Sequence, residues 1–272
     1  MLRFGTAGIP IATEPRNTQN GVAMVRTLGL EAMELEFVHS VNISPEMAPL
    51  VKEIAKKRDV TLTCHGQYYI NLNSDEKGEA SAQRVLNAAR RAWECGAWSV
   101  CFHAGFYMGQ PAEHVHDRIK KHLESITKIL RDEENKIWIR PEVSGKPTQF
   151  GSLEETIRLS EEVEGVMPCI DFSHLHARTN GKYNTYEEFS QVLAAVEKAL
   201  ERHGLENMHI HTSGINYGPK GEKNHLLLDE SDMNYKDLAR AWKDFKISGV
   251  VICESPNIEG DALLLKKTWE KS

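Results

Sequence analysis

Residues 60–103 read VTLTCHGQYYINLNSDEKGEASAQRVLNAARRAWECGAWSVCFH and contain one complete strand–helix–strand unit. The apolar and β-branched run over residues 60–64 predicts a strand, and the amphipathic stretch over residues 77–95 predicts the helix that follows it. Gly96 stands where that helix should stop, and residues 99–102 predict the next strand. A strand, a helix and a second strand in this order are typical of a parallel α/β fold.

The same unit recurs along the rest of the 272-residue chain. Short apolar runs predict eight strands, at residues 2–6, 32–36, 60–64, 99–102, 137–140, 167–170, 208–211 and 250–253. Amphipathic stretches predict a helix after each of them, at residues 18–28, 45–57, 77–95, 112–131, 153–163, 186–203, 235–246 and 260–270. Eight such units predict an α/β fold in which residues 1–272 form a single (β/α)8 TIM-barrel domain. An open doubly wound sheet is disfavoured, because the first strand is not followed by the G-x-G-x-x-G pattern of that fold.

Composition and charge narrow the class of protein. The chain is 40% hydrophobic and 26% charged, which is typical of a folded globular protein and excludes a disordered one. Its formal net charge of -6 argues against indiscriminate nucleic-acid binding through a basic face. The chain begins without a signal-peptide pattern and has no apolar run of membrane-spanning length, so we expect a cytoplasmic protein with no membrane contact. Five cysteines without a CxxC pair indicate buried, reduced thiols.

Histidines and carboxylates stand at the ends of six consecutive predicted strands. They are His65, His103, Glu142, Asp171, His209 and Glu254. Because the C-terminal ends of the strands of a (β/α)8 barrel converge, these side chains should meet in one small volume, where unpaired carboxylates would repel each other. A divalent cation removes that repulsion, and mixed imidazole and carboxylate ligands suit Zn²⁺, with Mn²⁺ or Fe²⁺ as alternatives. We expect His176 and His211, which lie nearby in sequence, to orient ligands rather than to bind a cation.

The segments that carry these residues resemble the endonuclease IV family of zinc-dependent apurinic/apyrimidinic (AP) endonucleases, within the xylose isomerase-like TIM-barrel superfamily. The matching segments are residues 64–72 (CHGQYYINL), 102–105 (FHAG), 141–146 (PEVSGK), 169–174 (CIDFSH), 208–210 (MHI) and 253–257 (CESPN). They occur in the family's order and span essentially the whole chain. The resemblance implies a monomeric DNA-repair hydrolase whose substrate is abasic double-stranded DNA.

The resemblance also implies a cluster of two to three zinc ions. His65, His103 and Glu142 would hold one ion; Glu142, Asp171, His209 and Glu254 would hold the second; His174 and His225 would hold the third. Glu142 would then be the bridging and catalytic residue. Tyr68 matches an aromatic residue that the family inserts into DNA at the lesion, and Tyr69 would support it. The third site departs from the family pattern, because Lys223 stands where an aspartate is expected. Either Glu222 completes that site through a register shift, or the site is weakly occupied.

Two other functions fit parts of the same pattern. Sugar isomerases and epimerases of this superfamily also place Glu, Asp, His and Glu after the fifth to eighth strands, where a single cation holds the substrate. A non-catalytic binding protein that kept the barrel is a third hypothesis. His65, His103 and His174 favour the endonuclease, because an enzyme with one cation does not need all three.

Overall fold

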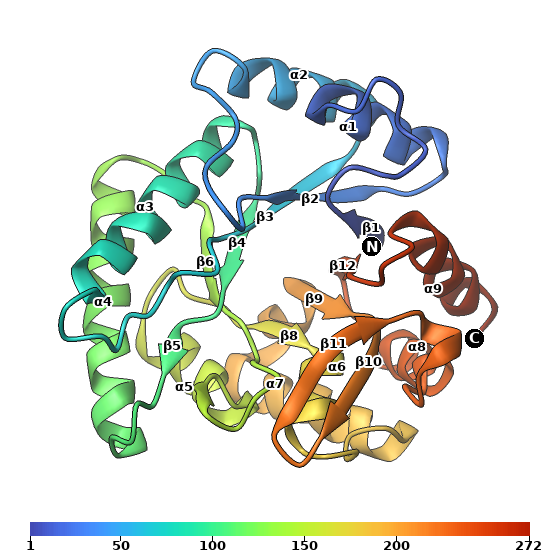
Figure 1. The fold of residues 1–272 in the computed structure, drawn as a ribbon. Coiled ribbons are helices and arrows are strands. Elements are labelled where there is room, and N and C mark those ends of the chain that lie inside the picture. The colour runs from blue at the N-terminus through green and yellow to red at the C-terminus, as the bar shows by residue number, and fades with distance from the viewer.

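The computed structural model describes residues 1–272 and consists of a nearly closed barrel of eight parallel strands surrounded by helices (Figure 1). The barrel strands are β1 (Leu2–Ala7), β2 (Ala32–Glu36), β3 (Thr61–His65), β4 (Ser99–Phe102), β6 (Trp138–Pro141), β8 (Cys169–Asp171), β9 (Met208–Thr212) and β12 (Gly249–Cys253). The helices are α1 (Thr18–Thr27), α2 (Ala48–Arg58), α3 (Gly78–Glu94), α4 (Ala112–Asp132), α5 (Leu153–Glu162), α6 (Phe172–Arg178), α7 (Tyr186–Glu206), α8 (Tyr235–Asp244) and α9 (Glu259–Lys271). The predicted (β/α)8 fold is therefore confirmed.

The strand order explains how the barrel closes. Hydrogen-bonded neighbours run β6-β4-β3-β2-β1-β12-β9-β8. The two ends of this sheet, β6 and β8, meet through two isolated parallel bridges, Ile139 with Val166 and Glu142 with Cys169. Because every strand is parallel, all C-terminal ends lie at one mouth of the barrel, and the residues that follow the strands are brought together there.

The loops at this mouth contain structure that the sequence pattern does not predict. A hairpin of β10 (Gly214–Gly218) and β11 (Gly221–Leu226) follows β9 and lies in front of the barrel in Figure 1. A second small sheet pairs β5 (Gly105–Phe106) with β7 (Gln149–Phe150), and η1 (Leu228–Glu230) is a short 3-10 helix. The hairpin and the short helix α6 carry two of the candidate ligands, His225 and His174.

The predicted helix over residues 45–57 begins later than expected. Pro49, rather than Pro45, lies in the first turn of α2, and the main-chain N–H of Met47 donates to the carbonyl of Ser44 in the turn that precedes the helix. By contrast, α5 begins where predicted, because Ser152 and Glu155 form a capping box at its N-terminus.

The apolar core lies mainly between the strands and the surrounding helices, and it includes Phe4, Phe102 and Trp242, all buried. The inside of the barrel is instead rich in buried polar groups, including Glu34, Arg140 and His209. TIM-barrel interiors are usually filled by branched apolar side chains, so this polar interior points to a ligand-binding role. No helix in the structure combines the length and the apolar character that crossing a membrane requires.

Candidate metal centre

Two histidines and a glutamate form the first group of candidate ligands. His65 ends β3, His103 follows β4 and Glu142 follows β6. Nε2 of His65 lies 3.3 Å from Oε2 of Glu142, and Nε2 of His103 lies 3.6 Å from the same oxygen. Their ligand atoms all lie within 4.8 Å of one another. The structure therefore brings together the three residues that the sequence predicts as ligands of one cation.

The other carboxylate oxygen of Glu142 faces a second group. Oε1 of Glu142 lies 3.2 Å from Nδ1 of His211, and Oε1 of Glu254 lies 3.6 Å from that nitrogen. Asp171, at the end of β8, completes a set of four ligand atoms within 4.8 Å of one another. Glu142 and Asp171 are fully buried, so their carboxylates lie close together in a region shielded from water.

The residue of β9 that lies nearest this group differs from the predicted one. The sequence predicts His209 as the ligand and His211 as an orienting residue, whereas it is His211 that reaches Glu142 and Glu254. The strand continues to Thr212, so His209 lies two residues deeper in the barrel, on the same face as His211. Nε2 of His209 faces Glu34 there, 3.0 Å from Oε2.

A third group lies between α6, β11 and the end of β12. The ligand atoms of His174, His225 and Glu254 all lie within 4.8 Å of one another. Oε2 of Glu222 lies 3.6 Å from Nε2 of His174, whereas Lys223 is exposed to solvent. From the sequence, Lys223 stands where the resemblance implies an aspartate ligand. The structure brings Glu222, and not Lys223, close to His174.

In three of these imidazoles, Nδ1 donates a hydrogen bond to a main-chain carbonyl. This bond determines which ring nitrogen remains free to bind a cation. The distances from Nδ1 are 2.7 Å for His65 (Gly66 carbonyl), 3.1 Å for His174 (Val143 carbonyl) and 3.1 Å for His225 (Glu254 carbonyl). A carbonyl oxygen only accepts, so each Nδ1 carries the hydrogen and each Nε2 is left free. Nε2 faces Glu142 in His65, Glu222 in His174 and Glu254 in His225, whereas Nδ1 of His174 also lies 3.0 Å from Oδ2 of Asp171. This is the arrangement by which proteins orient metal-binding histidines.

His211 lies between carboxylates, and its partner Glu34 is not among the residues predicted from the sequence. Nε2 of His211 lies 2.9 Å from Oε1 of Glu34, and Nδ1 faces the second group. Glu34 and Glu36 alternate with apolar residues in β2, the same two-residue spacing that marks one face of a strand, and this signal could have found them. Burial raises the pKa of Glu36 to about 8, and the charge of Glu34 adds to the rise.

His176, in contrast, lies away from all three groups. Its Nδ1 is 2.7 Å from the carbonyl of Lys182, and its Nε2 is 3.2 Å from Oδ1 of Asp232. Both nitrogens are thus engaged in hydrogen bonds that hold the C-terminal part of α6.

The electrostatics of the three groups fit a bound cation. Oε2 of Glu142, Oδ2 of Asp171 and Oε2 of Glu254 are buried oxygens without a well-formed hydrogen bond. Burial raises the pKa of Glu254, and the charges of Glu142 and Asp171 raise it further against the opposing effect of nearby histidines. Burial lowers the pKa of His65, but its contact with Glu142 and the charges of the surrounding carboxylates outweigh that effect and raise the pKa to about 10. Imidazole nitrogens and carboxylate oxygens in so negative a site suit Zn²⁺, Mn²⁺ or Fe²⁺.

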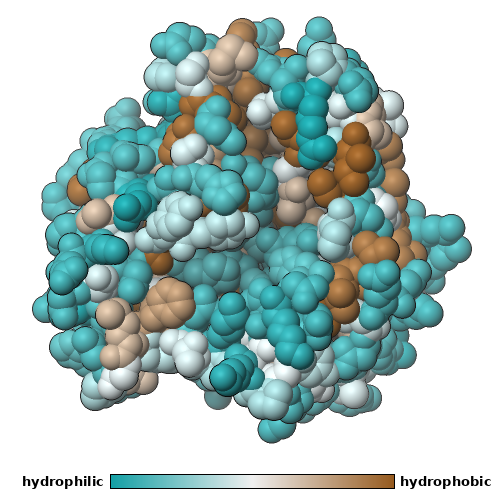
Figure 2. All heavy atoms as spheres, viewed as in Figure 1, coloured by the Kyte–Doolittle hydropathy of each residue, from teal (hydrophilic) through white to brown (hydrophobic).

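Two tyrosines stand on the rim beside these groups. The side chains of Tyr68 and Tyr69, in the loop after β3, are 58% and 61% exposed. The ring of Tyr68 lies 6.0 Å from that of His65 and 5.7 Å from that of His39. Figure 2 shows a hollow at the centre of this face with hydrophilic residues on its floor. A substrate that enters the hollow would pass the two tyrosines.

Comparison with known proteins places the chain in a family. Residues 22–271 match the family described as Xylose isomerase-like TIM barrel, and the chain belongs to this family. It is 43% identical over 273 residues to an uncharacterized protein of Methanocaldococcus jannaschii, and the match covers 100% of this chain and 98% of the relative.

Solved structures with the same fold include an endonuclease and a protein similar to sugar epimerases. Endonuclease IV from Thermus thermophilus superposes with a TM-score of 0.74 at 18% identity, covering 98% of this chain and 100% of that one. A D-tagatose 3-epimerase-like protein superposes with a TM-score of 0.73 at 19% identity, covering 98% of this chain and 96% of that one. At these identities the likeness shows the fold alone. The choice between the two activities must come from the site.

Proposed function

We propose that this protein is a zinc-dependent AP endonuclease that hydrolyses the phosphodiester bond 5′ to abasic sites in double-stranded DNA. The observation that carries the proposal is the position of Glu142, whose Oε2 faces His65 and His103 while its Oε1 faces His211. A carboxylate that presents one oxygen to each of two ligand groups suits a bridge between two cations. Paired cations of this kind are typical of enzymes that cleave phosphodiesters.

Each ligand group has a role in this proposal. His65 and His103 would share one cation with Glu142, whereas Asp171, His211 and Glu254 would share the second with it. His174 and His225 would hold the third, with Glu222 close to His174. Bound zinc ions supply Lewis acidity, which lowers the pKa of water and neutralises charge that develops on phosphate oxygens. The hydrogen bonds at each Nδ1 keep the ligand nitrogens of His65, His174 and His225 aimed into the site.

The rim supports a DNA substrate. An abasic nucleotide lacks a base to stack, so it leaves the duplex at the least cost in energy. Tyr68 and Tyr69 are exposed aromatic side chains beside His65, where they can stack on the bases that flank the gap. Because the chain carries a net charge of -6, attraction for the DNA phosphates would come chiefly from the cations in the hollow.

One observation favours a sugar epimerase as the second candidate. Glu142, Asp171, His211 and Glu254 by themselves form a complete four-ligand group, which is sufficient for a single cation that holds a sugar. The endonuclease accounts for more of the structure, because a single-cation enzyme leaves His103, His174 and His225 without a role.

The test uses purified, zinc-loaded protein and a DNA duplex that carries one tetrahydrofuran abasic analogue. We expect a single cut that leaves a 3′-hydroxyl and a 5′-phosphate on the abasic residue, and no cut in an undamaged duplex. Glu142→Gln should fold normally but lose at least about a hundredfold in rate, because it removes a charge that both groups share. Absence of cleavage, together with C3 epimerisation of a ketohexose by the same preparation, would assign the protein to the second candidate function.

A further inference from the structure

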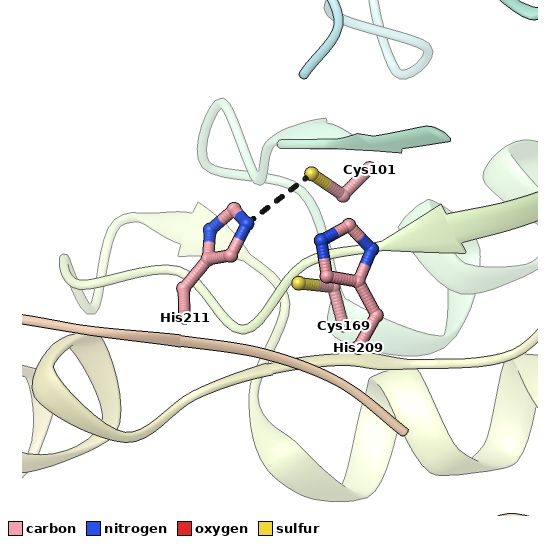
Figure 3. Close-up of side chains that lie close together, drawn as sticks. All are labelled: Cys101, Cys169, His209 and His211. Carbon is pink, nitrogen blue, oxygen red and sulfur yellow. Dashed lines mark hydrogen bonds between the residues drawn. The ribbon is translucent and has the colours of Figure 1, made fainter. Parts of the chain in front are cut away.

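Deeper in the barrel, beyond the metal centre, lies a second set of ligand-type side chains. Cys101 on β4, Cys169 on β8 and His209 on β9 are fully buried, and their ligand atoms and that of His211 all lie within 4.8 Å of one another. In Figure 3 the two sulfur atoms lie between the imidazole rings of His209 and His211. Glu34 reaches the same place from β2. We call Cys101, Cys169, His209 and Glu34 the lower cluster.

Two distances within the lower cluster are close to those between the ligand atoms of a tetrahedral zinc site. Zinc–sulfur bonds of about 2.3 Å and zinc–nitrogen or zinc–oxygen bonds of about 2.0 Å separate neighbouring ligand atoms by about 3.3–3.8 Å. Oε2 of Glu34 lies 3.6 Å from Sγ of Cys101 and 3.0 Å from Nε2 of His209. Sγ of Cys169 lies within 4.8 Å of Sγ of Cys101 and of a ring nitrogen of His209. A bound cation would draw this sulfur toward the other three ligand atoms.

The ring of His209 is oriented as a ligand. Its Nδ1 lies 2.9 Å from Oγ of Ser99, which holds the ring in place. Its Nε2 is buried, faces Glu34 and has no well-formed hydrogen bond. A hydroxyl at one ring nitrogen and an unsatisfied second nitrogen match the way in which proteins position histidine to bind a metal.

A buried positive charge beside the lower cluster would be stabilised by negative charge on the two sulfur atoms. Arg140 is fully buried and is paired with Cys101 in the register of β4 and β6. Its hydrogen bonds go only to the carbonyls of Pro168 and Asn207 and to the side-chain oxygen of Asn207, and no carboxylate pairs with it. The guanidinium lies over the ring of Trp98 and lacks an anionic partner. Two metal-bound thiolates would supply one.

We propose that Cys101, Cys169, His209 and the carboxylate of Glu34 bind one Zn²⁺ as a closed structural site, separate from the cations of the metal centre. Binding replaces the two thiol protons, which are released to solvent. The other oxygen of Glu34 lies 2.9 Å from Nε2 of His211, so one carboxylate joins the structural site to the metal centre. The site goes beyond the proposed endonuclease activity and does not depend on it, because no substrate reaches these buried side chains.

The test is the absorption spectrum of protein produced with Co²⁺ in place of Zn²⁺, under reducing conditions. Thiolate ligands give cobalt a charge-transfer band in the near ultraviolet, and none of the ligands in the metal centre contains sulfur. We expect this band in the wild-type protein, a loss of the band in Cys101→Ser and in Cys169→Ser, and one zinc fewer per chain in the zinc-loaded variants. Cys253→Ser is the matched control, since Cys253 is buried but belongs to no candidate metal group.

Absence of the thiolate band from folded wild-type protein would overturn the proposal, as would a band that persists in the double variant Cys101→Ser/Cys169→Ser. If a serine variant does not fold, the presence or absence of the thiolate band in the wild-type spectrum still tests the proposed structural site. Cleavage of the abasic duplex is measured on the same samples. A thiolate band without cleavage would support the structural site and count against the endonuclease, whereas cleavage without the band would do the reverse.

Discussion

Oε1 of Glu34 lies 2.9 Å from Nε2 of His211, and both side chains are fully buried inside the barrel. Nδ1 of the same ring faces Glu142 and Glu254, so the carboxylate of Glu34 holds the ring from its other side. Neighbouring Cys169, Glu34 and Glu254 outweigh burial and raise the pKa of His211 well above its ordinary value, so a bound cation would replace a proton on this ring. Glu34 is therefore a positioning residue for the second ligand group.

Replacement of Glu34 by glutamine should weaken cation binding without unfolding the barrel. Loss of a carboxylate that orients a ligating histidine typically lowers metal affinity by about 10–100-fold. We expect that loss in a titration against a zinc indicator, together with slower cleavage of the abasic duplex that excess zinc restores. Glu53→Gln, on the exposed face of α2, is the control and should change neither quantity. Unchanged zinc affinity in folded Glu34→Gln would contradict the positioning role.

The barrel and most of its ligand groups could be predicted from the sequence because both depend on local patterns. Short apolar runs that alternate with amphipathic stretches determine the fold, and a residue that closes a strand must lie at the mouth. His65, His103, Glu142 and Asp171 follow this rule and lie together.

The other residues of the site could not be predicted in this way, because their positions depend on features that local sequence patterns do not reveal. The choice between His209 and His211 depends on where β9 ends, and strand ends are uncertain from sequence by more than the two residues that separate these histidines. Glu34 lies within a strand rather than at its end, so the pattern of residues that close strands does not include it. The β10–β11 hairpin, with His225 on it, is built from polar residues that resemble an ordinary loop.

The two rim tyrosines should contribute to DNA binding but not to the chemistry. Stacking of an aromatic side chain on a base contributes about 1–3 kcal/mol, so Tyr68→Ala and Tyr69→Ala should each weaken binding of the abasic duplex by roughly 5–150-fold. Hydrolysis of bis(p-nitrophenyl) phosphate, which is too small to need the rim, should stay at the wild-type rate. Equal losses on both substrates would show that the tyrosines support the metal centre instead.

Glu162 should make stability depend on pH under acid conditions. Its carboxylate accepts a hydrogen bond from Nε2 of His116 at 3.0 Å and also pairs with Arg158 and Lys120, and these contacts lower its pKa to about 2. A lowered folded-state pKa stabilises the protein above the ordinary value of 4.5, and this contribution disappears as the pH falls through about 2.

Urea unfolding between pH 2 and 7 would measure this effect. Wild-type protein should be more stable than Glu162→Gln above a pH of about 4.5, and the difference should vanish near pH 2. Glu161→Gln is the matched control, because its exposed neighbouring carboxylate makes none of these contacts. A stability difference that stays constant across the range would exclude the ionised Glu162 as its cause.

The third ligand group should depend on Glu222 and not on Lys223. The pairing of β10 with β11 goes from Asn224 directly to Glu222 and skips Lys223, so a bulge shifts the alternation of side chains by one residue. This shift brings Oε2 of Glu222 to 3.6 Å from Nε2 of His174 and leaves Lys223 in solvent.

Glu222→Gln should therefore lower the zinc content by up to one ion per chain and slow cleavage, because the third ligand group loses its nearby anionic oxygen. Lys223→Asp should leave both quantities close to wild type. A rise in zinc content and rate in Lys223→Asp would instead mean that the third site of the wild-type protein is weakly occupied because it lacks that aspartate.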